Sequence, residues 1–250
     1  MKQFLIKYLP DFVRKFLIKQ KYKKYNLLTH KKNISEGKLV NIKCQNKEKY
    51  EFLKNILKKS FGGIIKVDKY DLYFHPIAII KKPNNINEYL KLIGAKSRNM
   101  IKKAQKNQIE CKLFEWNDFL DDIYDINTSS LIRQGRKMDD AYFKYPEPIK
   151  IKNEEDFQII HIGAFSDGKL IGYIELYVYG NFAMTNRILG HKKYLKLGIM
   201  NLLFYKTIET LIEKEIEYLN YLTMQNKENN SLSAFKYRVG FREYSLLELK

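Results

Sequence analysis

Residues 157–189 read FQIIHIGAFSDGKLIGYIELYVYGNFAMTNRIL. The stretch holds three runs rich in apolar, β-branched and aromatic residues, Phe157–Phe165, Leu170–Tyr179 and Phe182–Leu189. The residues between the runs, Ser166-Asp167-Gly168 and Gly180-Asn181, are types that favour tight turns. Because tight turns join antiparallel neighbours, the stretch predicts a three-stranded antiparallel meander.

The segments around the meander alternate between helical and extended patterns. After it we expect a helix at Tyr194–Lys214, a strand at Tyr218–Leu222, a short helix at Ser231–Tyr237 and a strand at Arg242–Leu249. Before it we expect a strand at Leu39–Cys44, a helix at Lys47–Lys59, a hairpin at Ile64–Val67 and Leu72–Ile80, a basic helix at Asn87–Asn107, a strand at Ile109–Phe114, a helix at Asp118–Leu131 and a long loop to Asp156. The pattern predicts one α+β domain over residues 34–250, with a mixed, mainly antiparallel central sheet flanked by helices.

Composition excludes several classes of protein. The chain has 250 residues, and its 46 Lys and Arg against 28 Asp and Glu give a net charge of 46 − 28 = +18. Two cysteines, Cys44 and Cys111, are too few for a disulfide scaffold and favour a reducing compartment. Four scattered histidines have no ligand spacing, so no metal is expected. The longest apolar stretch is interrupted by Glu175, so no membrane span is expected.

Residues 1–33 predict a basic amphipathic helix or arm. Apolar residues recur at helical spacing on one stripe, and Asp11 is the single acid between Met1 and Lys32. Such a helix suits an anionic membrane surface, docking on its own domain, or a partner helix, and the sequence leaves these open. Pro10, Asp11 and Arg14 interrupt the apolar region, so a secretory signal is not expected. We expect a cytoplasmic protein, peripheral on the inner membrane face if the helix binds lipid.

The order of elements resembles that of the GNAT acyltransferase superfamily over Phe157–Lys250. The segment Ser231–Phe241, SLSAFKYRVGF, is similar to the closing helix of that family and its turn into the last strand. Glu88-Tyr89-Leu90 followed by residues 96–107, KSRNMIKKAQKN, resembles the basic helix of the Fem-like branch, which includes peptidoglycan peptidyltransferases. Phe235-Lys236 resembles the Phe-Lys pair of the same branch.

The resemblance implies an acyl donor and a place for it. In the superfamily the pyrophosphate of acetyl-CoA or another acyl-CoA lies at the N-terminus of the helix after the meander, where backbone N–H groups attract phosphate. We therefore assign donor binding to the residues that begin this helix, Leu197, Gly198, Ile199 and Asn201. Leu195 and Met200 depart from the family pattern, and Met200 is expected to crowd a phosphate. The Fem-like branch uses aminoacyl-tRNA instead, so this donor stays open.

Two residues are candidates for catalysis. Alternation places Glu175 on one face of its strand with Tyr173 and Tyr177, and a carboxylate partly buried there suits a general base. The alternative is a solvent-facing residue on a half-buried strand. By resemblance, Lys236 lies near the transferred acyl group and stabilises the oxyanion or the donor.

Arginines are the candidates for acceptor binding. Arg133-Gln134-Gly135-Arg136 places two guanidinium groups close together on a loop, which suits bidentate capture of phosphate or carboxylate. Arg98 adds a further cation from the basic helix. An anionic glycan, a nucleotide sugar or a lipid-linked precursor would explain the cluster. The alternative is a solvated basic turn.

Together these features predict an acyltransferase that carries out N-acetyl or aminoacyl transfer to a cell-envelope glycan or peptidoglycan precursor at the inner membrane surface. The alternative function is a noncatalytic module of the same fold that binds RNA or an anionic glycan. For RNA, tRNA included, the binding helix would be the one that carries Arg98, Lys102, Lys103 and Lys106.

Overall fold

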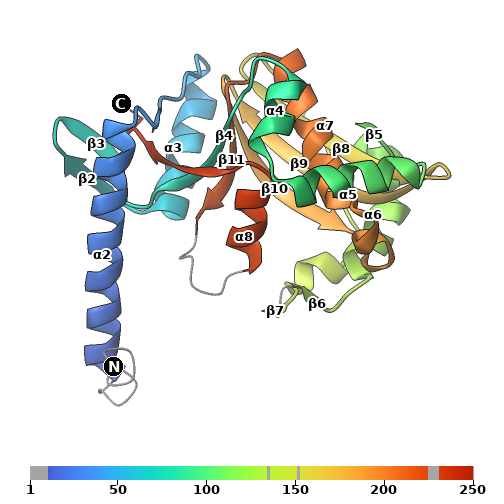
Figure 1. Ribbon diagram of the computed structural model, residues 1–250, viewed down its shortest axis with the longest axis horizontal. Coiled ribbons are helices and arrows are strands. Elements are labelled where there is room, and N and C mark those ends of the chain that lie inside the picture. Colours follow the sequence, from blue (N-terminus) through green and yellow to red (C-terminus); the bar gives the residue numbers. More distant parts are fainter. Residues whose placement is uncertain (1–10, 134–135, 151–152, 225–230, 250) are drawn as a thin grey trace.

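The protein is built around a central β-sheet. The computed structural model describes residues 11–133, 136–150, 153–224 and 231–249. Its strands are β1 (Leu39–Val40), β4 (Ile77–Lys81), β5 (Glu110–Leu113), β8 (Phe157–Ser166), β9 (Lys169–Tyr179), β10 (Phe182–Gly190), β11 (Tyr218–Thr223) and β12 (Arg242–Leu246). Among the described residues these eight strands pair in the order β1-β12-β4-β11-β10-β9-β8-β5 (Figure 1). Strands β8, β9 and β10 are antiparallel neighbours, so the predicted meander is confirmed.

The pairing of β10 with β11 is parallel and short. It joins Phe182 to Tyr218, Ala183 to Leu219 and Met184 to Asn220. Beyond these pairs β10 continues to Gly190 along β9, whereas β11 pairs with β4. The two middle strands of the sheet therefore separate after three residue pairs.

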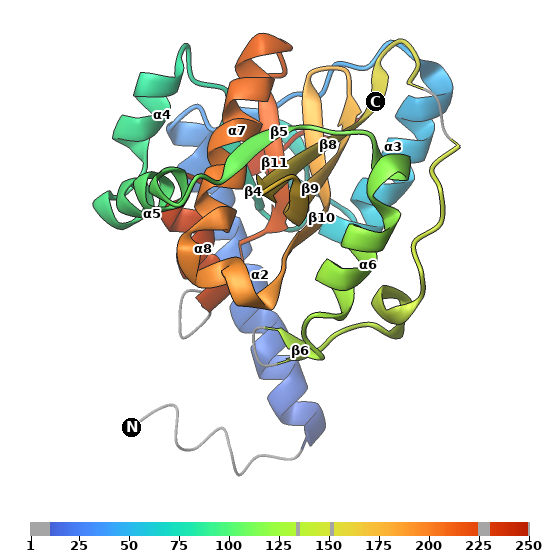
Figure 2. The same cartoon turned by 90° about the vertical axis from the view of Figure 1, so that its right-hand side faces the viewer.

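Helices cover both faces of the sheet. On one face α5 (Ala95–Lys106) and α7 (Ile199–Glu213) pack on the meander, and this core includes Ile162, Ile174 and Leu203. On the other face α3 (Lys47–Phe61) covers one end and α6 (Leu120–Thr128) the other, each over its own apolar cluster (Figure 2). The expected α+β fold, with a mainly antiparallel sheet flanked by helices, is confirmed.

The short elements complete the chain. They are the hairpins β2 (Ile64–Val67) with β3 (Tyr70–Tyr73) and β6 (Ile132–Arg133) with β7 (Arg136–Lys137), the 3-10 helices η1 (Trp116–Phe119), η2 (Asp140–Phe143) and η3 (Lys192–Leu197), and the helices α4 (Ile86–Leu92) and α8 (Ser231–Arg238). The region expected as a loop from Ile132 to Asp156 thus contains the β6–β7 hairpin and η2.

The basic helix expected at Asn87–Asn107 is two helices, α4 and α5. Ile93 and Gly94 between them are extended, with ψ angles of 151° and 157°. The Arg98 guanidinium donates to the carbonyl oxygens of Leu90 and Ile93, and so caps the end of α4. Arg98 Nη1 thus holds a helix turn together, and the role of Arg98 in substrate binding stays a prediction.

The helix predicted within residues 1–33 is present from Asp11 as α2 (Asp11–Ser35), and residues 1–10 lie outside the described residues. The two halves of α2 differ. The C-terminal half is fixed to the domain: buried His30 lies 2.7 Å from Ser245 Oγ, and Tyr25 donates to Glu243 at 2.6 Å. The residues from Lys19 to Lys24 are exposed, and this half projects beyond the domain (Figures 1 and 2). No helix in the described ranges combines the length and the apolar character that a membrane span needs.

Candidate functional site

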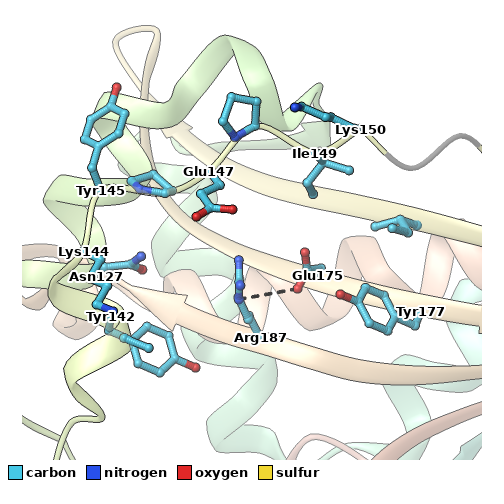
Figure 3. Close-up of a pocket in the computed structure, with 14 residues that line it drawn as sticks. Asn127, Tyr142, Lys144, Tyr145, Glu147, Ile149, Lys150, Glu175, Tyr177 and Arg187 are labelled. Carbon is cyan, nitrogen blue, oxygen red and sulfur yellow. Dashed lines mark ion pairs between the residues drawn. The ribbon is translucent and has the colours of Figure 1, made fainter.

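A cavity of about 660 Å³ lies on the sheet face that α3 and α6 share. Its floor consists of residues from β8, β9 and β10, and its roof is the segment that follows β7 (Figure 3). The lining residues are Asn127, Ala141, Tyr142, Lys144, Tyr145, Pro146, Glu147, Pro148, Ile149, Lys150, Ile159, Glu175, Tyr177 and Arg187. A cavity of this size on a rigid sheet is the first place to look for a substrate site.

Glu175 lies at the floor of the cavity, and its side chain is 1% exposed. Glu175 pairs with His161 of β8 and with Arg187 of β10, which places the three side chains in one row across the meander. His161 Nε2 is 3.3 Å from Glu175 Oε1, and Arg187 Nε is 3.7 Å from Oε2. The Asn186 side chain also donates to Oε2. A buried carboxylate is thus held by polar partners on both oxygens while it faces a cavity.

A β-bulge makes this arrangement possible. The register of β10 against β9 shifts between Thr185 and Arg187, so that Asn186 is the extra residue. In a regular strand, neighbouring side chains point to opposite faces, whereas a bulge can direct two consecutive side chains to one face. Asn186 and Arg187 consequently both reach Glu175. The Arg187 guanidinium also lies 5.2 Å from the centre of the Trp116 ring, a distance at which the ring attracts the cation.

The roof of the cavity is tied to η1. Trp116 Nε1 donates to the Glu147 carbonyl at 3.1 Å, and the Asn117 side chain bonds both backbone groups of Ile149, at 2.8 and 3.2 Å. Charged groups of both signs line the space below it, because Lys144, Glu147 and Lys150 join Glu175 and Arg187 (Figure 3). The long loop predicted here is therefore a fixed cavity wall with a mixed charge.

Lys236 of α8 is buried where β11 has separated from β10. Its side chain is 2% exposed, and Nζ donates to the carbonyls of Tyr221 at 2.7 Å and Thr223 at 2.9 Å. The ammonium lies 4.2 Å from the centre of the Tyr221 ring. Burial lowers the pKa of Lys236 to about 8.

Lys236 is not among the residues that line the cavity, whereas Tyr142 is. Tyr142 is part of the cavity roof. Burial raises the pKa of Tyr221 to about 12, and the nearby Tyr142 phenol adds to the rise. Tyr142 of the roof and Tyr221, whose ring Lys236 contacts, thus influence each other electrostatically.

The Arg133 guanidinium has partners that the sequence did not indicate. Nη1 donates to the Gly190 carbonyl at 2.8 Å, and Nη2 donates to the Ile126 carbonyl at 2.8 Å and to Ser129 Oγ at 3.1 Å. Arg133 thus caps the end of α6 and ties β6 to the end of β10. This corrects the expectation of an anion clamp, because its fork is directed at internal acceptors. Gln134 and the side chain of Arg136 lie outside the described residues.

The residues expected to hold the donor meet at the start of α7. Gly198 is the N-cap with a left-handed φ of +91°, and no side chain caps the helix there. The amides of Asn201 and Leu202 bond the Gly198 carbonyl at 3.0 and 3.1 Å, and Leu197 ends η3 just before it. A Cβ on Gly190 would lie 2.9 Å from Met200 Sδ, so the Met200 thioether packs inward and does not cover the amides.

A basic surface surrounds this helix start. Exposed lysines from α5 and η3 meet here, since Lys103 Nζ donates to the Lys196 carbonyl at 2.9 Å. The sequence has no acidic residue from Tyr89 to Ile109 or from Leu176 to Ile208. An uncapped helix N-terminus amid lysines fits the phosphate groups of an acyl-CoA or of tRNA. The exposed lysines are Lys96, Lys102, Lys103, Lys106, Lys192, Lys193 and Lys196.

Gly198→Ala is expected to destabilise the protein by about 2–4 kcal/mol. A Cβ at this position would lie 2.2 Å from the Met100 carbonyl oxygen on a left-handed residue. Gly168→Ala is the matched control, because Gly168 has a similar φ of +79° with open space around it, and it should cost about 1 kcal/mol. Urea unfolding of both variants measures the difference. Equal destabilisation would show that the contact between α5 and the loop is not close.

Several solved structures are similar to this one, and FemX shares its fold. The structure of FemX superposes with a TM-score of 0.56 at 10% identity and covers 78% of this chain and 66% of FemX. L-PGS from Bacillus licheniformis gives 0.47 at 14% identity, covering 70% of this chain and 60% of that one. The PaiA N-acetyltransferase from Thermoplasma acidophilum, solved with coenzyme A, gives 0.42 at 20% identity, covering 55% and 96%. The chain thus spans less than two thirds of FemX and of L-PGS.

One comparison of sequences gives a match over part of the chain. No curated protein matches the chain significantly. The sequence profile of the acetyltransferase (GNAT) family matches residues 120–241, which run from α6 through the meander and α7 to the end of α8. The resemblance read from the order of elements is confirmed: residues 120–241 carry a GNAT acetyltransferase domain.

Proposed function

We propose that the protein transfers an acetyl or aminoacyl group to an amine of a cell-envelope glycan or peptidoglycan precursor. The observation that carries the proposal is the row His161, Glu175 and Arg187 at the floor of a cavity within the GNAT domain. The cavity is large enough for an acceptor, and the row offers a carboxylate that is fixed before the substrate arrives.

In the proposed reaction, Glu175 accepts a proton from the acceptor amine as its nitrogen attacks the acyl carbonyl. A bound acyl-CoA or aminoacyl-tRNA supplies the activated acyl group. The new C–N bond forms as the C–S bond of a thioester or the C–O bond of an ester breaks, and the proton taken by Glu175 returns to the leaving thiolate or alkoxide. Lys236, in its charged form, stabilises the negative charge that develops on the acyl oxygen.

The cavity wall supports an acceptor that carries charge besides its amine. Lys144, Lys150 and Arg187 can pair with a carboxylate or phosphate, and Glu147 can pair with an ammonium group. The cell-envelope assignment is supported by the resemblance of Asn87–Lys250 to the Fem-like branch and by the fold shared with FemX. We assign the donor's phosphates to the basic surface around Gly198.

Ligand-induced stabilisation tests the donor. Acetyl-CoA at 100 times its Kd should raise the free energy of unfolding by about 2.7 kcal/mol, and aminoacyl-tRNA is the second donor to try. Lys193→Gln with Lys196→Gln should weaken either effect, whereas Lys58→Gln with Lys59→Gln on α3 should not. If neither donor stabilises the protein, and RNA of any sequence binds with a steep salt dependence, the binding-module alternative replaces the enzyme.

A further inference from the structure

Two apolar side chains stand out from the domain at the β6–β7 hairpin. Leu131 is 65% exposed and Ile132 is 64% exposed, which makes them the most exposed large apolar side chains of the described residues. Together they form a small exposed apolar patch at the start of the hairpin. Adjacent apolar residues so exposed favour contact with a partner or a lipid phase.

The hairpin holds these residues in a fixed position. The Met138 amide donates to the Leu131 carbonyl at 2.9 Å, and the Arg133 guanidinium bonds both β10 and the end of α6. The Lys192 amide donates to Ser129 Oγ at 3.1 Å, which joins the base of the hairpin to η3. Leu131 and Ile132 are therefore presented outward by a braced structure.

The projecting half of α2 carries the complementary feature, which is charge. Lys19, Lys21, Lys23 and Lys24 are exposed there, together with Tyr22 at 43%. Between Arg14 and Lys32 the sequence contains no acidic residue. The rest of α2 is anchored by His30 and Tyr25, so the lysines extend from a helix whose direction is set by the domain.

Both features lie on one side of the molecule. Figure 2 is Figure 1 turned about the vertical axis, and in both views the hairpin and the first turns of α2 lie below the sheet. We propose that the β6–β7 hairpin and the projecting half of α2 form one surface that binds an anionic lipid bilayer. The lysines attract the lipid headgroups, and Leu131 and Ile132 enter the boundary between headgroups and acyl chains.

This surface bears on the acceptor, and in this respect it rests on the proposed function. The hairpin and the cavity roof are close together in the chain. Strand β7 ends at Lys137, and η2 begins at Asp140 and contributes Ala141 and Tyr142 to the roof. A bilayer that contacts the hairpin therefore lies next to the cavity. The acceptor class that fits is a lipid-linked precursor with its amine-bearing headgroup in the cavity.

The test is binding of the full chain to vesicles, with no donor or acceptor present. Vesicles of equal parts phosphatidylglycerol and phosphatidylcholine should bind the protein, and pure phosphatidylcholine should bind it far less. Lys23→Gln with Lys24→Gln should weaken binding about 30-fold, at about fivefold per lysine. Lys58→Gln with Lys59→Gln, an adjacent exposed pair on α3, is the matched control and should change it less than twofold.

The hairpin has its own variant. Leu131→Ser with Ile132→Ser should weaken binding at least tenfold and remove the part that survives high salt. Phe52→Ser on α3, where the side chain is 57% exposed, should leave binding unchanged. The proposal is overturned if the hairpin variant and the lysine variant both bind vesicles as tightly as the wild-type protein does. It is also overturned if the wild-type protein does not bind vesicles but forms a dimer, and the hairpin substitutions dissociate that dimer. Acyl transfer to a water-soluble acceptor is measured separately, so either idea can fail alone.

Discussion

Glu175→Gln is expected to lower kcat for acyl transfer by about 10²–10⁴-fold, with a much smaller change in KM. The substitution keeps the size of the side chain and removes the group that accepts the proton. Because Glu175 lies on the cavity floor between His161 and Arg187, no other carboxylate of the described residues has this combination of burial and partners. Steady-state kinetics against amine concentration measures both constants.

The control for this variant is Glu209→Gln. Glu209 lies on α7, on the opposite side of the sheet, where it pairs with Lys206 at 3.3 Å. Its loss should change kcat less than threefold. A Glu175→Gln protein with a native unfolding transition and near wild-type kcat would show that the base is another group or water.

Lys236→Met is expected to lower kcat by about 10²–10³-fold. Methionine preserves the length of the side chain and removes the charge near the separation of β10 and β11. The dependence of the wild-type kcat on pH should reflect the same ammonium group. The pKa of Lys236 is lowered to about 8, so activity that needs the ammonium falls as the pH rises above that value. The variant should lack this fall.

Stability gives a readout of Lys236 that does not depend on activity. The folded pKa of about 8 lies below the ordinary value of 10.5, so the unfolded chain binds more protons between these pH values. Wild-type stability should therefore rise between about pH 8 and pH 10.5, and the Lys236→Met protein should lack this rise. Lys214→Met, at an exposed position after α7, is the control. An unchanged rate and pH profile in folded Lys236→Met would remove Lys236 from the mechanism.

The fold could be predicted where its signals are local. The meander follows from alternation and from turns at Asp167-Gly168 and Gly180-Asn181, which lie next to the strands they join. The break between α4 and α5 also had a local signal in Gly94, but apolar periodicity on both sides suggested one continuous helix. Strand order, in contrast, depends on contacts such as Ile80 with Leu219, which no local pattern contains.

The site could be predicted only in part, for a related reason. Glu175 was visible because a carboxylate interrupts an apolar strand. Arg187 and Asn186 were not, because the bulge that directs both to Glu175 changes the alternation without a sequence signal. For Arg98 and Arg133 the sequence shows two cations, whereas the structure gives them backbone carbonyls at the ends of α4 and α6. Which carbonyl a guanidinium reaches is decided by tertiary packing.

The short parallel pairing of β10 and β11 also affects how the protein is made. It separates a half-sheet of neighbouring chain segments, β5 and β8–β10, from one in which β1 and β4 pair with the late strands β11 and β12. The meander β8–β10 within the first half can form early, because tight turns join its strands. During synthesis, however, the apolar strand Ile77–Ile80 leaves the ribosome long before its partners exist. The nascent chain must keep this edge from aggregating until the last strand emerges, so ribosome stalling near the C-terminus should expose it to chaperones.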